Sequence, residues 1–186
     1  MSLRFAILAA LAEKSGTGIE LARRFDRSYG YFWPASHQQI YREVDRLRGE
    51  GLVDSEIPDG PPQRGRPRSI SITKAGRDAL AAWVSELDAP PAERSPLAVR
   101  VRAAAALGTT DGLREALQHE IAVRQARLAD YRQFEQRGFA ADEPGRLRHA
   151  VLRGGIQLEE AWIEWAEEVL TLLDDAALTE HRDPRQ

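Results

Sequence analysis

Apolar residues recur at intervals of three and four along most of this chain, which is the spacing that places side chains on one face of an α-helix. The first helix is predicted to begin near Leu3. A second follows a break at Gly16 and Thr17, and Thr17 is suited to cap it because its hydroxyl can accept a backbone hydrogen bond. The side chains predicted to face a common core are Leu3, Ile7, Leu8 and Leu11 in the first helix and Ile19, Leu21, Ala22 and Phe25 in the second.

The third predicted helix begins at or next to Ser36. Ser36 and Gln39 have the spacing of a capping box, in which each side chain satisfies a backbone donor of the first turn. Ile40, Val44 and Leu47 then form one apolar face. The opposite face is polar and carries side-chain types that reach base edges and phosphates when a helix lies in the major groove of DNA. The residues expected to contact DNA are Ser36, His37, Gln38, Gln39, Tyr41, Arg42 and Arg46.

A solvated outer face is the ordinary alternative for an amphipathic helix, and the segment that follows shifts the interpretation toward DNA contact. The helix ends at Gly49 and Gly51, and two short strands are predicted next. The first strand contains Leu52, Val53 and Ile57, and the second runs from Ser69 to Thr73. Helix, strand, loop and strand in this order predict a recognition helix followed by a wing.

The loop between these strands is strongly cationic. From Gly60 to Arg77 the chain has five basic residues and no acidic one, although the whole chain has 29 acidic and 26 basic residues. Arginine beside glycine and proline at a hairpin tip is suited to a narrow minor groove or to phosphates. We therefore expect the wing to contact DNA through Arg64, Arg66 and Arg68.

A fourth helix is predicted from Ala75 to about Leu87, with Thr73 as its cap. It would return Leu80, Trp83, Val84 and Leu87 to the core. Paired prolines follow, and proline cannot continue a helix. The expected organisation is a winged helix-turn-helix domain over residues 1–88, a linker over residues 89–96, and a second domain over residues 97–186.

The second domain is predicted to be helical throughout. Its helices are expected over Leu97 to Leu107, Leu113 to about Gln136, and about Pro144 to Leu173. Apolar residues of the last helix alternate at steps of four and three, the repeat that packs one helix against another: Leu158, Trp162, Trp165, Val169, Leu172 and Ala176. The helices of this domain are too few and too long to enclose the seam within one chain. We therefore expect the chain to form a homodimer. From Ala89 onward the chain has 13 basic and 17 acidic residues, which argues against DNA contact there.

The composition excludes several classes of protein. The chain has 186 residues, 42% of them hydrophobic and 30% charged, as is ordinary for a soluble globular protein. It has no cysteine, no run of about 18 apolar residues and no signal-peptide pattern, so a cytoplasmic location is expected. The four histidines are scattered, and no hydrolase or phosphate-loop motif occurs. We expect no enzyme activity, no catalytic residue, no metal site and no cofactor.

Three segments together resemble the PadR family of bacterial transcriptional regulators: ILAALAEKSGTGIELARRF, FWPASHQQIYREVDRLRGEGLV and GRPRSISITKAGRDALAAWV. The family usually has tyrosine at the positions of Ile19 and Ile70, so contacts of those two hydroxyls are absent here while the apolar bodies remain. The fold that follows is mainly α with a small two-stranded β-wing. It comprises an N-terminal winged helix-turn-helix and a C-terminal antiparallel long-helix dimerisation domain.

The resemblance implies a sequence-specific regulator, a repressor in our interpretation, that binds a pseudo-palindromic operator in double-stranded DNA as a homodimer. It also implies release by a small aromatic or hydrophobic effector near the dimer interface. The residues expected at an effector site or at the dimer interface are Leu158, Trp162, Trp165 and Val169. Whether the two tryptophans stack on a ligand or only fill the seam stays open. A winged-helix module for protein assembly and a regulator without an effector remain alternatives.

Overall fold

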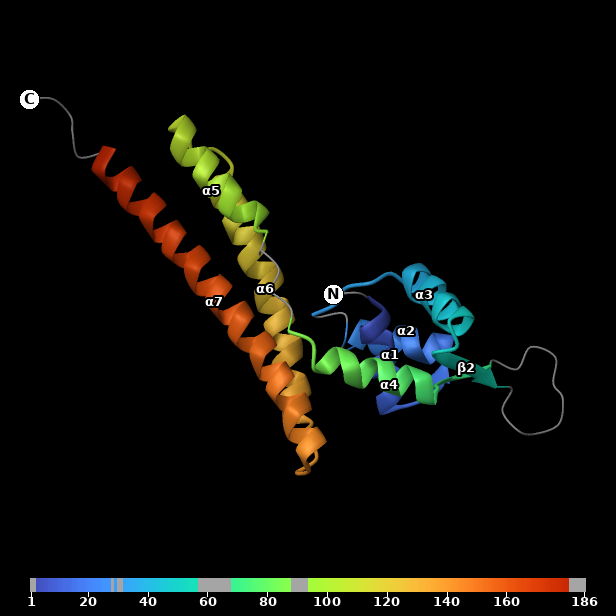
Figure 1. The fold of residues 1–186 in the computed structure, drawn as a ribbon. Coiled ribbons are helices and arrows are strands. Elements are labelled where there is room, and N and C mark those ends of the chain that lie inside the picture. The colour runs from blue at the N-terminus through green and yellow to red at the C-terminus, as the bar shows by residue number, and fades with distance from the viewer. Residues whose placement is uncertain (1–2, 28, 30–31, 57–67, 88–93, 181–186) are drawn as a thin grey trace, which may run out of the picture. The chain divides into compact units, whose positions relative to one another are not determined.

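A computed structural model describes residues 3–27, 29, 32–56, 68–87 and 94–180 of the chain. The chain divides into two compact units, Met1–Pro90 and Pro91–Gln186 (Figure 1). The described residues form seven helices and three short strands, which confirms the predicted mainly helical class. None of the helices in these ranges is both long and apolar enough to cross a membrane.

The N-terminal unit combines four helices with a three-stranded antiparallel sheet of order β1-β3-β2. Its elements are α1 (Leu3–Glu13), β1 (Gly16–Thr17), α2 (Gly18–Arg27), α3 (His37–Gly49), β2 (Val53–Glu56), β3 (Ser69–Ile72) and α4 (Lys74–Val84). The wing pair β2 and β3 was predicted, whereas β1 was not. With only two residues, β1 is too short to show a strand pattern in the sequence.

The core of this unit lies between the helices and the sheet. The fully buried side chains include Ile7 and Leu8 of α1, Leu21 and Phe25 of α2, and Ile40 and Leu47 of α3, which confirms these predicted apolar faces. Three core predictions are wrong. Ile19 is 55% exposed because it lies in the first turn of α2 on the outer side, and Val84 and Leu87 are exposed because α4 ends at Val84. Trp83 does pack inward, stacked on Phe5 with ring centroids 4.7 Å apart.

A tight junction joins the wing to the end of the recognition helix. Thr73 donates its backbone N–H to the carbonyl oxygen of Leu52 at 3.1 Å, and its hydroxyl lies 2.8 Å from the carbonyl oxygen of Gly51. The same hydroxyl accepts the N–H of Gly76 at 3.0 Å and so caps α4. A Cβ atom at Gly76 would lie 2.1 Å from the Leu52 oxygen. Only glycine allows the start of α4 to approach this turn so closely.

The C-terminal unit contains α5 (Pro96–Leu107), α6 (Leu113–Gln136) and α7 (Glu143–Glu180). Helices α6 and α7 pack antiparallel, as ion pairs at three levels show: Arg114 with Asp174, Arg127 with Glu159, and Glu135 with His149. Helix α7 has 38 residues and is therefore about 57 Å long. It begins near the predicted residue and extends beyond the predicted end.

Apolar side chains fill the space between these helices. They are Leu113, Leu117, Ile121, Leu128 and Tyr131 of α6 and Ile156, Ile163, Ala166 and Val169 of α7. Gly155 lies where the helices approach closely, since a Cβ there would be 3.2 Å from the Tyr131 ring, whereas Gly154 faces open space. Both glycines lie inside the continuous helix α7.

Candidate nucleic-acid interface

The recognition helix α3 begins with the predicted capping box. Ser36 Oγ accepts the backbone N–H of Gln39 at 3.3 Å, and Gln39 Oε1 accepts the backbone N–H of Ser36 at 2.8 Å. The Ser36 hydroxyl also donates to Gln39 Oε1 at 3.1 Å. The oxygens of both side chains thus hold the helix start, and the Gln39 amide nitrogen is the part of that side chain left to reach a ligand.

A carboxylate lies beside the first residue of α3. His37 Nε2 is 2.9 Å from Asp26 Oδ2 of α2, and both side chains are about half exposed. The pair links α2 to α3 at the surface expected to contact DNA. Sequence inspection missed Asp26 because it precedes His37 by eleven residues and shares no helix with it.

The other predicted contacts of α3 are exposed. Gln38 and Arg42 are open to solvent, and Arg46 forms a helix-surface pair with Glu50 at 3.1 Å. Tyr41 is 40% exposed, and its ring lies against the backbone of Gly18 at the start of α2. The face therefore combines amide, phenol and guanidinium groups with little apolar surface, as direct contact with base edges and phosphates requires.

Helix α2 is fixed at its start and along its inner side. Thr17 donates its N–H to Glu20 Oε2 at 2.7 Å, and Thr17 Oγ1 accepts the N–H of Glu20 at 3.3 Å, so Thr17 is the predicted cap in a full capping box. The Thr17 hydroxyl also donates to Glu20 Oε2 at 3.0 Å, and the hydrogen bonds that the Thr17 backbone N–H and hydroxyl donate to this carboxylate lower the pKa of Glu20. Arg24 donates to the carbonyl oxygens of Ala10 and Lys14 at the end of α1, at 2.6 and 2.5 Å.

The wing is described only in part. Arg68 is exposed and directly precedes β3, which pairs with β2 in the register Glu56 to Ser69. Arg64 and Arg66 lie outside the described residues. The strands β2 and β3, which flank the cationic loop, are thus paired as predicted. The contacts of the loop arginines with DNA stay a prediction.

The predicted seam of α7 is only partly buried within the chain. The buried stripe of α7 is formed by Ile156, Glu159, Ile163, Ala166 and Val169. Of the predicted seam residues, Val169 belongs to this stripe, Leu158 is 54% exposed and Leu172 is 62% exposed. Trp162 and Trp165 are half-buried and contact each other edge to face, with centroids 5.3 Å apart. The seam therefore presents a second, outward apolar face on α7.

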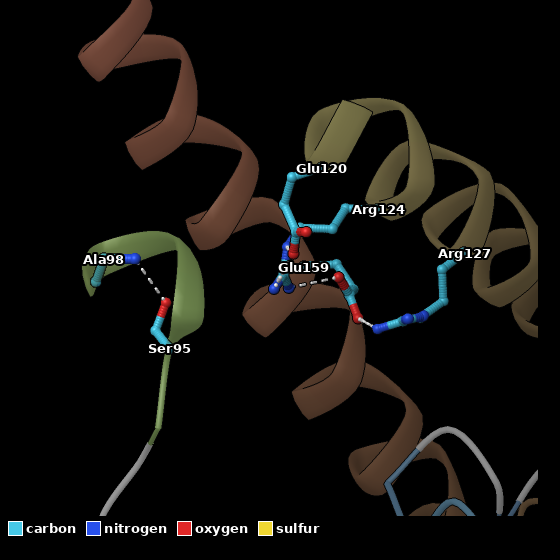
Figure 2. Close-up of polar contacts among 6 residues, drawn as sticks. All are labelled: Ser95, Ala98, Glu120, Arg124, Arg127 and Glu159. Atoms are coloured by element: carbon cyan, nitrogen blue, oxygen red, sulfur yellow. Dashed lines mark hydrogen bonds and ion pairs between the residues drawn. The ribbon is translucent and has the colours of Figure 1, made fainter. Parts of the chain in front are cut away.

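A buried acid joins α6 to α7. Glu159 is only 4% exposed, and Figure 2 shows its carboxylate between two arginines of α6. Arg124 Nη1 donates to Glu159 Oε2 at 3.0 Å and Arg127 Nη1 donates to Oε1 at 2.7 Å. Arg124 also binds Glu120, and its guanidinium lies 4.9 Å from the centroid of the Trp162 ring. The hydrogen bond to Glu159 raises the pKa of Arg127.

A pocket of about 380 Å³ opens beside this network. Its lining includes Trp162 with Arg94, Arg100, His119, Glu120 and Arg124, drawn from all three helices and the segment before α5. Leu158, Trp165 and Val169 do not line it. Among the described residues, no group of three His, Asp or Glu side chains could hold a metal ion.

Two family models match the chain. Residues 7–82 match the model described as the transcriptional regulator PadR-like family. Residues 93–174 match the model described as virulence activator alpha C-term.

Individual relatives extend over nearly the whole chain. It is 38% identical to the probable transcriptional regulator Rv1176c of Mycobacterium tuberculosis, over 94% of this chain and 99% of that protein. The structure of the virulence activator AphA of Vibrio cholerae is similar, with a TM-score of 0.77 and 32% identity over 94% of this chain and 99% of AphA. Both comparisons include the N-terminal and the C-terminal unit.

The negative transcriptional regulator PadR of Bacillus subtilis has the same fold. Its complex with operator DNA matches with a TM-score of 0.78 at 21% identity, over 91% of this chain and 98% of PadR. Its complex with p-coumaric acid matches with a TM-score of 0.73 at 22% identity, over 92% of this chain and 98% of PadR.

The capping box yields a stability prediction. Replacing Gln39 by Ala removes the acceptor for the Ser36 N–H and should lower the free energy of unfolding by about 0.5 to 1.5 kcal/mol, the net value of one hydrogen bond. Gln39→Glu keeps an acceptor at this position and should retain most of that stability. Urea denaturation followed by circular dichroism measures both, with Gln38→Ala as the neighbouring control. If Gln39→Ala is as stable as Gln38→Ala, the hydrogen bond from the Ser36 N–H to the Gln39 side chain contributes nothing to stability.

Proposed function

We propose that this chain, which belongs to the PadR-like family of transcriptional regulators, binds operator DNA as a homodimer and acts as a repressor. The observation that carries the proposal is the exposed polar face of α3, capped at Ser36 and joined to a wing that leads into a cationic loop. In this arrangement Gln38, Tyr41 and Arg42 enter the major groove. The arginines of the wing hold phosphates or the minor groove.

The outward face of α7 supports the proposed homodimer. Leu158 and Leu172 are exposed on α7, whose other face already packs against α6. We expect the same helix of a second subunit to bury them. A twofold dimer presents two copies of α3 to a pseudo-palindromic operator, with half-sites about 34 to 36 Å apart.

A small-molecule effector would occupy the pocket beside Trp162. An aromatic carboxylate fits its chemistry, because the ring can stack on the indole and the acid can pair with Arg94, Arg100 or His119. B. subtilis PadR, which shares the fold, has been solved with p-coumaric acid, a compound of this class. A ligand that contacts α5, α6 and α7 together can alter the angles at which these helices cross. It would regulate DNA binding if it bound one of two helix arrangements more tightly than the other.

We propose repression as the direction of regulation, as for the negative regulator PadR from B. subtilis. AphA, in contrast, is named an activator. A reporter gene under the chain's own promoter distinguishes the two. Deletion of the regulator should raise expression if it represses and lower expression if it activates.

The wing prediction tests DNA binding itself. Changing Arg64, Arg66 and Arg68 together to Ala should weaken binding to duplex DNA from the promoter of its own gene. It should also flatten the salt dependence by up to about 0.9 log unit for each arginine–phosphate interaction that is removed. Mobility-shift titrations at several salt concentrations measure both quantities.

A matched control removes the same charge from the other unit, by changing the exposed residues Arg102, Arg137 and Arg148 to Ala. This control should leave both affinity and salt slope unchanged. Equal loss in the two triple variants would show a non-specific charge effect. Absence of any wild-type shift would favour the alternative in which the wing binds an acidic protein partner.

The dimer prediction uses side chains that the chain itself leaves exposed. The double change Leu158→Gln and Leu172→Gln should convert the dimer to monomers, since each buried leucine contributes about 1.5 to 3 kcal/mol and a twofold interface loses each change twice. Helicity should persist, because neither side chain belongs to the buried stripe of α7. Analytical ultracentrifugation measures the state. In contrast, Ile163→Ala should destabilise each subunit. A double variant that stays dimeric would place the interface elsewhere.

The effector prediction separates the two neighbouring tryptophans. Isothermal titration with p-coumaric acid should show saturable binding that Trp162→Leu weakens about two- to tenfold, the range of a single aromatic interaction. Trp165→Leu is the matched control, because Trp165 does not line the pocket. Bound ligand should also weaken DNA affinity. Equal effects of the two changes on ligand affinity would mean that both tryptophans act only through packing. Binding of p-coumaric acid without any change in DNA affinity would contradict regulation by an effector.

A further inference from the structure

We propose that Gly18 is a positioning residue for DNA recognition: it provides the space in which the Tyr41 ring lies, and so sets where the phenol hydroxyl meets the DNA. This inference rests on the proposed DNA-binding function. It concerns a residue of α2 that has no DNA-reading group of its own. The two helices involved, α2 and α3, are neighbours in the N-terminal unit (Figure 1).

The Tyr41 ring lies at the position that a Cβ atom of residue 18 would occupy, which glycine leaves empty. A Cβ atom built at Gly18 would lie 2.8 Å from Cε1 of Tyr41, 3.4 Å from Cδ1 and 3.9 Å from Cζ. Carbon atoms are in favourable contact at about 3.5 to 4.0 Å. A methyl group at residue 18 would therefore have to displace the edge of the ring by about 0.7 to 1.2 Å.

The ring has to move because the backbone on either side is fixed. Gly16 and Thr17 of β1 pair with Ile70 and Ser69 of β3, and the Thr17 capping box holds the first turn of α2. On the other helix, Ile40 and Val44 anchor α3 in the core on both sides of Tyr41. Tyr41 itself is 40% exposed, so its side chain has room to turn outward.

The backbone conformation gives no separate reason for a glycine. Gly18 is not among the glycines of the described chain with positive φ. Alanine there would be free of backbone strain and would restrict the unfolded chain, which favours stability. The requirement for glycine at this position is thus the space that Tyr41 occupies.

The displacement matters because of what the hydroxyl can do. Within the part of the chain that the structure describes, the Tyr41 hydroxyl makes no hydrogen bond, so it is available to donate to an acceptor on DNA. An O–H···O bond requires oxygen atoms about 2.5 to 3.0 Å apart. A shift of the ring edge by about 1 Å exceeds that window.

The experiment compares Gly18→Ala with Gly49→Ala, a change at the end of α3 where a Cβ would meet nothing within 4 Å. The probe is the operator duplex that the wild-type protein selects from a random pool, and fluorescence anisotropy gives the affinity. Gly18→Ala should bind this duplex about three- to tenfold more weakly, the range of one net hydrogen bond. Its melting temperature should be unchanged or higher. Gly49→Ala should bind as the wild type does.

A double-mutant cycle identifies the cause. In a Tyr41→Ala background there is no ring to displace, and in Tyr41→Phe there is no hydroxyl to misplace, so Gly18→Ala should have no further effect in either. A loss of affinity that persists in these backgrounds means that the methyl group acts on DNA directly or on the fold, and it overturns the positioning role. Full wild-type affinity of Gly18→Ala overturns it too. Selection of no duplex by the wild-type protein would instead refute the DNA-binding function, and the positioning role with it.

Discussion

The carbonyl oxygen of Leu52 is the point on which the N-terminal unit depends. It accepts the backbone N–H of Thr73 and lies so close to Gly76 that a Cβ there would collide with it. The end of the recognition helix, the first wing strand and the start of α4 therefore meet at one atom. Through the sheet this constraint extends to β1, and β1 fixes the start of α2, against which the Tyr41 ring lies. Backbone geometry thus positions the helices and strands that carry the groups proposed to bind DNA, and side-chain contacts such as that of His37 with Asp26 add to it.

In the C-terminal unit the corresponding constraint is electrostatic. Removing one partner of a buried ion pair typically costs about 3 to 5 kcal/mol, because the remaining charge is left without compensation. Glu159 holds two arginines of α6, so α6 and α7 have one strongly preferred register. With this face of α7 committed within the subunit, Leu158 and Leu172 remain on the outside. Arg124 also contacts Trp162, which connects the register of the helices to the wall of the pocket.

The sequence predicted what depends on neighbours along the chain. The capping box of Ser36 and Gln39 and the apolar face of α3 require only fixed spacings, and both are present in the structure. Contacts between distant segments were missed, such as Asp26 with His37 or the arginines around Glu159, because no regular spacing in the sequence predicts them. Ile19 was assigned to the core by its helical spacing from Ala22 and Phe25, but its side chain lies on the outer side of α2. The seam of α7 was recognised as a repeat, but the sequence does not say which part of it α6 covers.

Under the proposed function, the pairing of Asp26 with His37 bears on how the protein distinguishes its operator from unrelated DNA. A regulator meets a great excess of unrelated duplex, and its arginines attract all of it through the phosphates. In the proposed complex, the Asp26 carboxylate beside the first turn of α3 would oppose the attraction of the arginines to any duplex alike. Contacts with the bases would then have to supply the affinity that distinguishes the operator.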